Sequence, residues 1–121
     1  MNMNILLVDD EQELVSTLAE RLSIRGIEAD WTSSGEEALV KVTDQAYDLA
    51  VLDVKMPKIS GLELQAEMEK IRPELKYIFM TGHGSERDFR SGSSDTRTIC
   101  YLIKPVNIDI LISKIKEALA R

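Results

Sequence analysis

The stretch Leu49-Ala50-Val51-Leu52-Asp53 decides the fold, because an unbroken apolar run ends there in a single carboxylate. A short continuous apolar run is typical of a strand that a parallel sheet buries on both faces. A carboxylate that directly follows such a strand loses its hydration unless another group compensates its charge. We therefore predict a buried strand over residues 49–52, and Asp53 at its end is the first candidate for a functional residue.

Strand and helix patterns alternate along the chain on both sides of this stretch. Further strands are predicted at residues 4–8, 27–32, 77–80 and 100–103. Apolar residues recur at helical spacing between and after them, most clearly at Ile108, Leu111, Ile112, Ile115 and Leu119. Strands that alternate with helices imply right-handed crossovers and a mainly parallel sheet with helices on both faces. The sequence therefore predicts an α/β fold.

The helix boundaries can be placed from caps and breakers. The second helix is expected to begin near Ser34 or Gly35 and to direct inward Ala38, Leu39, Val42 and Ala46. The third is expected to begin after a turn at Gly61 and to end before Pro73. Residues 85–98 contain few helix formers and almost no apolar periodicity. A fourth helix in that segment is expected to be short or mobile.

Length and charge limit the function classes. The 121 residues fit a single domain, residues 1–121, with one continuous core. Fifteen Lys and Arg against 21 Asp and Glu give a net charge of −6, which disfavours direct binding to nucleic acid or to an anionic membrane. No apolar stretch approaches the roughly 20 residues that span a bilayer, so a cytoplasmic protein is expected. Cys100, the only cysteine, is expected to be a small core residue.

Polar residues gather where the predicted strands end. Asp9 and Asp10 follow the first strand, Asp53 the third, Thr81 the fourth and Lys104 the fifth. Each has an ordinary alternative, since acidic pairs cap helices and a lysine is usually exposed. Ligand sites in such sheets lie at the carboxyl ends of the strands. Their coincidence at successive strand ends therefore favours one common site.

Phosphoryl transfer is the chemistry that suits these side chains. Converging carboxylates repel unless a cation lies between them, and carboxylate ligands suit Mg²⁺ better than zinc, which prefers His and Cys. Asp53 could act as a nucleophile and form an aspartyl phosphate. Lys104 would supply a positive charge to the incoming phosphoryl group, and Thr81 a hydroxyl donor.

The ordered motifs resemble the response-regulator receiver domains of two-component signalling. They are Leu7-Val8-Asp9-Asp10-Glu11, Asp53-Val54-Lys55-Met56-Pro57 with Gly61, Met80-Thr81-Gly82, and Tyr101-Leu102-Ile103-Lys104-Pro105. The resemblance implies a flavodoxin-like, doubly wound parallel sheet in the strand order 2-1-3-4-5, with about five helices. It also implies a phosphorelay regulator that takes a phosphoryl group onto Asp53 from a sensor histidine kinase or a histidine phosphotransfer protein. Such a regulatory phosphoprotein is not an ordinary enzyme, because it catalyses only its own phosphorylation and dephosphorylation.

The resemblance also implies roles for individual residues at the acceptor site. Asp10, Asp53 and the backbone carbonyl of Lys55 would bind Mg²⁺ directly, and Asp9 would act through water. Thr81 and Lys104 would hold the phosphoryl group.

A two-state switch is the remaining implication, with Thr81 and Tyr101 coupling the phosphoryl group to a surface that binds a downstream effector protein or domain. A phosphorylation-dependent homodimer is one form that this output could take. Lys55 and His83 lie at positions that vary in receiver domains and could tune loss of the phosphoryl group, although an exposed loop residue is the favoured explanation of His83. The peptide before Pro105 is expected to be cis by the same resemblance.

Two alternatives from other classes remain open. A flavodoxin-like electron carrier would share the fold, but Asp9-Asp10-Glu11 would repel the phosphate of a flavin. A binding module that has lost phosphorylation would not need Asp10, Asp53, Thr81 and Lys104, which are all present. An ordinary phosphatase or kinase is less consistent with a chain that shows no evident substrate pocket.

Overall fold

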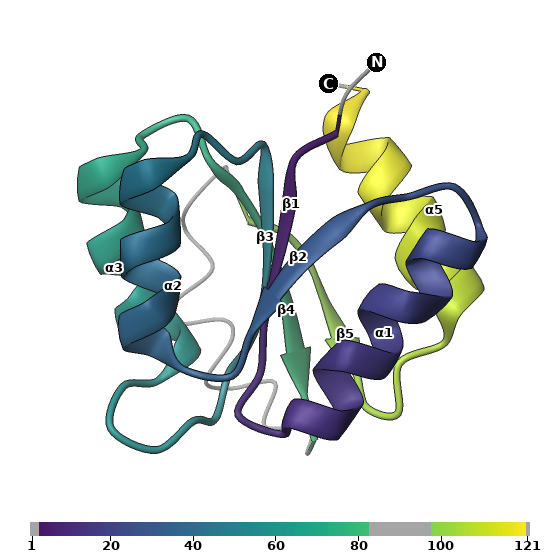
Figure 1. The fold of residues 1–121 in the computed structure, drawn as a ribbon, viewed down its shortest axis with the longest axis horizontal. Helices are drawn as coiled ribbons and strands as arrows, with labels where there is room; N and C mark the ends of the chain where they lie inside the picture. Colours follow the sequence, from purple (N-terminus) through teal and green to yellow (C-terminus); the bar gives the residue numbers. More distant parts are fainter. Residues whose placement is uncertain (1–2, 83–97, 121) are drawn as a thin grey trace.

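The computed structural model describes residues 3–82 and 98–120 as one five-stranded parallel sheet with helices on both faces (Figure 1). The strands are β1 (Ile5–Val8), β2 (Ala29–Thr32), β3 (Leu49–Asp53), β4 (Lys76–Thr81) and β5 (Thr98–Ile103). The helices are α1 (Gln12–Ile24), α2 (Gly35–Asp44), α3 (Gly61–Ile71) and α5 (Ile108–Leu119). The strand order is β2-β1-β3-β4-β5 and every pair is parallel, which confirms the predicted doubly wound fold.

The two faces of the sheet carry separate cores, because successive side chains of a strand point to opposite faces. In β1, Ile5 and Leu7 pack with α1 and α5, whereas Leu6 and Val8 pack with α2 and α3. In Figure 1, α1 and α5 cover one face of the sheet, and α2 and α3 cover the other. Strands buried on both faces read as continuous apolar runs, which explains why β1 and β3 were recognisable in the sequence.

Side-chain caps fix the starts of the helices on the α2 and α3 face. The Ser34 hydroxyl accepts from the Glu37 N–H at 3.0 Å, so α2 begins at Gly35 as predicted. Ser60 and Glu63 form a reciprocal capping box at the start of α3. These caps satisfy backbone donors that the first turn of a helix leaves unpaired.

The predictions differ from the structure at several boundaries. The prediction that Ala46 points inward from α2 is wrong, because the helix ends at Asp44, Gln45 is extended, and Ala46 is exposed. Strand β5 begins at Thr98 instead of Cys100, since its pairing with β4 continues past an irregularity in register. Cys100 is half-buried and packs against the core, as expected.

Two predictions fall outside the described residues. One is the short fourth helix in residues 85–98, of which only Thr98, the first residue of β5, is described, and the other concerns His83. Among the helices of the described ranges, none combines the length and apolar character that crossing a bilayer requires.

Candidate functional site

Strand register brings the predicted site residues together at one edge of the sheet. Val8 pairs with Leu52, Asp53 with Met80, and Thr81 with Ile103. The neighbouring strands β1, β3, β4 and β5 therefore end at nearly the same level, and the residues that follow them converge there. The expected gathering of polar residues at the carboxyl ends of the strands is what the structure shows.

Carboxylates form the centre of this site. One carboxylate oxygen from each of Asp9, Asp10 and Asp53 lies within 4.8 Å of the other two. Asp9 is completely buried and Asp53 is 4% exposed, whereas Asp10 faces solvent. The Glu11 N–H donates to Asp9 Oδ1 at 2.9 Å, and this hydrogen bond helps to orient the Asp9 carboxylate. The site thus concentrates negative charge at the boundary between the core and water.

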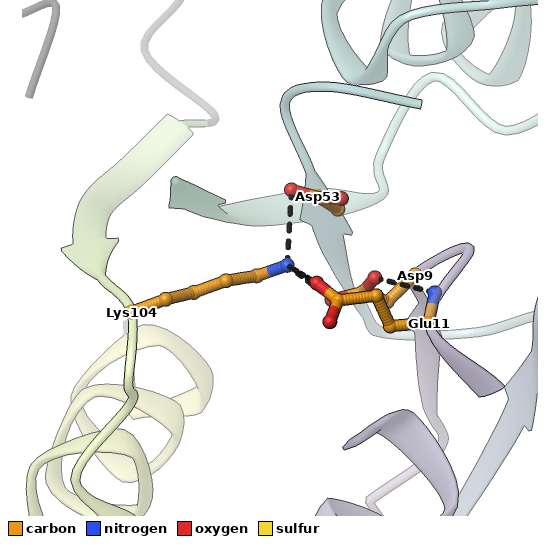
Figure 2. A network of polar contacts seen from close by, with 4 residues as sticks. All are labelled: Asp9, Glu11, Asp53 and Lys104. Carbon is orange, nitrogen blue, oxygen red and sulfur yellow. Dashed lines mark hydrogen bonds and ion pairs between the residues drawn. The ribbon is translucent and has the colours of Figure 1, made fainter. Parts of the chain in front are cut away.

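Lys104 is the cation that offsets this charge among the described residues (Figure 2). Its Nζ lies 2.7 Å from Asp9 Oδ2, 3.4 Å from Asp53 Oδ1 and 3.2 Å from Glu11 Oε1. The side chain is only 12% exposed. Burial lowers the pKa of the Lys104 ammonium, but its hydrogen bond to Asp9 and the nearby carboxylate charges outweigh burial and raise that pKa above its usual value. Lys104 is therefore charged at neutral pH.

The backbone holds Lys104 beside Thr81. The Lys104 N–H donates to the Thr81 carbonyl oxygen at 2.7 Å, which joins the ends of β5 and β4. Thr81 is itself buried, at the last position of β4. The Lys104–Pro105 peptide is cis, as the resemblance implied. Both residues expected to hold a phosphoryl group thus lie at adjacent strand ends.

Asp53 has a perturbed carboxyl group. Burial is the largest cause that raises its pKa, the negative charge of Asp9 adds to the rise, and Lys104 opposes both, with a resulting pKa of about 7. The ionised form of Asp53 is therefore poorly stabilised by the protein alone. A divalent cation would favour that form, which is also the nucleophilic one.

This perturbation predicts how stability depends on pH without Mg²⁺. In the unfolded chain the pKa of Asp53 is near 3.9, so its raised value in the folded state favours folding while the group is protonated. That contribution is complete below about pH 4 and is lost as the pH rises to about 7. Asp53→Asn should therefore be increasingly more stable than the wild type over this range, by on the order of 2–4 kcal/mol at pH 8. Urea unfolding of both proteins at several pH values checks this, and a pH-independent difference would contradict it.

The loop after Asp53 is closed by backbone contacts. The Val54 N–H donates to the Met80 carbonyl at 2.9 Å, and the Gly61 N–H donates to the Val54 carbonyl at 2.9 Å. A Cβ atom on Gly61 would lie 2.3 Å from the carbonyl oxygen of Asp53. Glycine at this position therefore allows the start of α3 to lie directly against the backbone of Asp53. The sequence had indicated only a turn at Gly61.

Tyr101 lies in β5, half-buried, with its ring stacked on that of Phe79 at a centroid distance of 5.3 Å. Phe79 in turn stacks on Tyr77 at 6.4 Å. Desolvation raises the pKa of the Tyr101 phenol. Tyr101 is thus connected to the core of β4, the strand that ends at Thr81.

The donor set fits a hard divalent cation. Asp9, Asp10 and Asp53 provide carboxylate oxygens, and the cluster contains no His or Cys, the ligands that zinc prefers. Three acids against one ammonium leave an excess of negative charge in a largely buried place. Mg²⁺ is suited to one or two such carboxylates together with water and phosphate oxygens. The acidic cluster could therefore bind this metal.

A doubly wound domain with an acidic, lysine-bearing site at its strand ends has the architecture of a signalling domain that accepts phosphoryl groups. Residues 5–116 match the response regulator receiver domain family, and the chain belongs to it. It is a receiver domain, the regulatory domain of response regulators, and works as a phosphorylation-dependent signalling switch.

The matches to curated relatives cover nearly the whole chain. The chain is 34% identical over 116 residues to the transcriptional regulatory protein GlrR of Escherichia coli K12, covering 96% of this chain and 26% of that protein. It is 32% identical over 119 residues to the sporulation initiation phosphotransferase F of Bacillus subtilis, covering 98% of this chain and 95% of the relative. The chain thus spans about a quarter of the length of GlrR and nearly the whole of the sporulation protein.

A solved structure of a similar protein has the same fold and contains magnesium and beryllofluoride. The response regulator TrrA of Thermotoga maritima, determined in complex with Mg²⁺ and beryllofluoride, is 39% identical with a TM-score of 0.81. The match covers 96% of this chain and 98% of that one.

Proposed function

We propose that this domain accepts a phosphoryl group on Asp53 in an Mg²⁺-dependent reaction, from a sensor histidine kinase or a histidine phosphotransfer protein. The observation that carries the proposal is the placement of the Lys104 ammonium between the buried carboxylates of Asp9 and Asp53, at 2.7 and 3.4 Å. A cation so placed can neutralise an anionic group arriving at Asp53 without moving far.

The metal would be held by Asp10, Asp53 and the backbone carbonyl of Lys55, with Asp9 acting through water. The proximity of the three carboxylates supports this assignment. When bound, Mg²⁺ would supply positive charge that stabilises the ionised Asp53 and the phosphoryl oxygens. Gly61 would contribute by holding the backbone of Asp53, and with it the loop that carries Lys55.

The chemical step is a displacement at phosphorus. An Asp53 carboxylate oxygen attacks the phosphorus of a phosphohistidine, the new O–P bond forms as the P–N bond breaks, and the electron pair stays on the imidazole nitrogen, which takes a proton from water. Lys104 neutralises one peripheral oxygen, and the Thr81 hydroxyl donates a hydrogen bond to another. Attack by water on the same phosphorus reverses the modification, so the domain would catalyse only its own phosphorylation and dephosphorylation.

The output would pass through Thr81 and Tyr101. Lys104 and Thr81 are joined by a backbone hydrogen bond, and Tyr101 stacks on Phe79 of the strand that ends in Thr81, so a shift of Thr81 has a route to the β5 surface. That surface would bind a downstream effector protein or domain, or a second copy of the domain. Lys55 and His83 are proposed to tune the lifetime of the phosphoryl group.

The proposed unit is residues 1–121 acting as one receiver domain in the cytoplasm. Its net charge of −6 favours proteins over nucleic acid or membranes as direct contacts of this domain. GlrR is named a transcriptional regulatory protein, and in a longer regulator of that kind we propose that nucleic acid would be contacted outside the receiver domain.

Intact mass after incubation with acetyl phosphate tests the proposal. We expect a gain of one phosphoryl group that requires Mg²⁺ and is absent from Asp53→Asn. If the folded wild type gains no mass from acetyl phosphate or from a phosphorylated histidine donor, the domain is a phosphorylation-independent binding module instead.

A further inference from the structure

Lys104 also contacts a third acid, Glu11, which has no role in the proposed phosphoryl transfer. Besides Asp9 and Asp53, its ammonium donates to Glu11 Oε1 at 3.2 Å, as Figure 2 shows. An ammonium group has one N–H donor for each of these carboxylates. A phosphoryl oxygen that binds Lys104 therefore competes with the existing partners for these donors.

The partners differ in how easily they can leave. Asp9 is completely buried, and moving its carboxylate away from Lys104 would leave an uncompensated charge in the core. Asp53 is the acceptor and stays at the site. The side chain of Glu11 is 61% exposed, so its carboxylate can turn into water at little cost in solvation. Glu11 is the partner that an incoming anion can displace.

The position of Glu11 in the fold supports a role at the site instead of in the helix. It is the N-cap residue of α1, where Ser, Thr, Asp or Asn usually accepts a hydrogen bond from the first turn. The Glu11 side chain makes no such capping bond and reaches Lys104 instead. Its backbone N–H is held by Asp9 Oδ1 at 2.9 Å, so the side chain projects from a fixed point beside the acidic cluster.

We propose that Glu11 occupies, in the unphosphorylated domain, the place on Lys104 that a phosphoryl oxygen takes. Glu11 is thus a positioning residue that keeps the ammonium oriented toward the acceptor and competes with the incoming group. The inference rests on the proposed function, because it assigns Lys104 to the phosphoryl group. Removing the Glu11 charge should favour the phosphorylated state in two ways, by freeing an N–H donor and by lowering repulsion of the anion.

Binding of beryllofluoride, a phosphoryl mimic, tests this at saturating Mg²⁺ by calorimetry. An ion pair with one exposed partner contributes about 0.2–1 kcal/mol, so Glu11→Gln and Glu11→Ala should bind beryllofluoride up to about fivefold more tightly than the wild type. Glu13→Gln is the matched control, because Glu13 is also an acid in the first turn of α1 but is not among the carboxylates that contact Lys104 in the described residues. We expect it to bind like the wild type.

The ¹⁵Nζ resonance of Lys104 gives a second readout in the absence of metal. Glu11→Gln should shift this resonance and Glu13→Gln should leave it in place. Equal affinities in all the proteins, or equal gains in the Glu11 and Glu13 variants, would overturn the inference and leave the proposed function intact. Failure of every protein, the wild type included, to bind beryllofluoride with Mg²⁺ would overturn the proposed function, and the inference with it.

Discussion

Lys104→Met is expected to destabilise the Mg²⁺-free domain by on the order of 2–4 kcal/mol, because it leaves the buried carboxylate of Asp9 without its cation. Methionine keeps the length of the side chain, so the loss reflects charge more than packing. The Lys104 side chain is 12% exposed, which places the expected effect below that of a fully buried pair.

Added Mg²⁺ should restore part of this stability, since a divalent cation at the cluster compensates the same carboxylates. Urea unfolding with and without Mg²⁺ measures both effects. Lys114→Met is the matched control, because Lys114 pairs with Glu117 at 3.4 Å within α5, where both side chains are more than a third exposed, and should change stability by less than about 0.5 kcal/mol. Similar losses in the two variants would mean that Lys104 does not stabilise the acidic cluster.

Gly61→Ala is the second substitution expected to have a large effect. The added Cβ would lie 2.3 Å from the carbonyl oxygen of Asp53 and 3.1 Å from Cα of Val54. Both contacts are with backbone, so no side-chain rotation relieves them, and either α3 or the loop after Asp53 must shift. We expect a loss of about 1–3 kcal/mol in stability and Mg²⁺ binding about 10- to 100-fold weaker, since a displaced supporting residue disturbs the metal ligands.

Calorimetric titration with Mg²⁺, together with urea unfolding, separates these two consequences. Gly26→Ala is a suitable control, because Gly26 has φ +83° and no atom within 4 Å of an added Cβ. It should lose about 1 kcal/mol through backbone strain while binding Mg²⁺ normally. If Gly61→Ala bound Mg²⁺ as tightly as Gly26→Ala does, the close approach at Gly61 would have no part in the site.

The sequence predicted the sheet and the convergence of the site because both depend on local patterns. Buried strands such as Leu49–Asp53 appear as unbroken apolar runs, and parallel strands necessarily bring their carboxyl ends to one edge. Asp53, Thr81 and Lys104 could therefore be assigned to one site before any distance was known.

Features that depend on distances across the fold could not be predicted in the same way. The contact between Glu11 and Lys104 joins residues that lie 93 positions apart, and Glu11 had been recognised only as part of a motif. The approach of Gly61 to the Asp53 carbonyl depends on how α3 packs at the end of β3. The error at Ala46 has a simpler origin, since apolar spacing continued for one turn after the backbone had left the helix.

The most direct test of the central claim is to locate the phosphoryl group chemically. Borohydride reduces an aspartyl phosphate to homoserine, and trypsin releases a peptide of residues 42–55 that contains Asp53 together with Asp44 and Asp48 as internal controls. After Mg²⁺ and acetyl phosphate, fragmentation of this peptide should place homoserine at position 53 and leave the other aspartates unchanged. Homoserine at another aspartate, with Asp53 intact, would contradict the assignment of Asp53 as the acceptor.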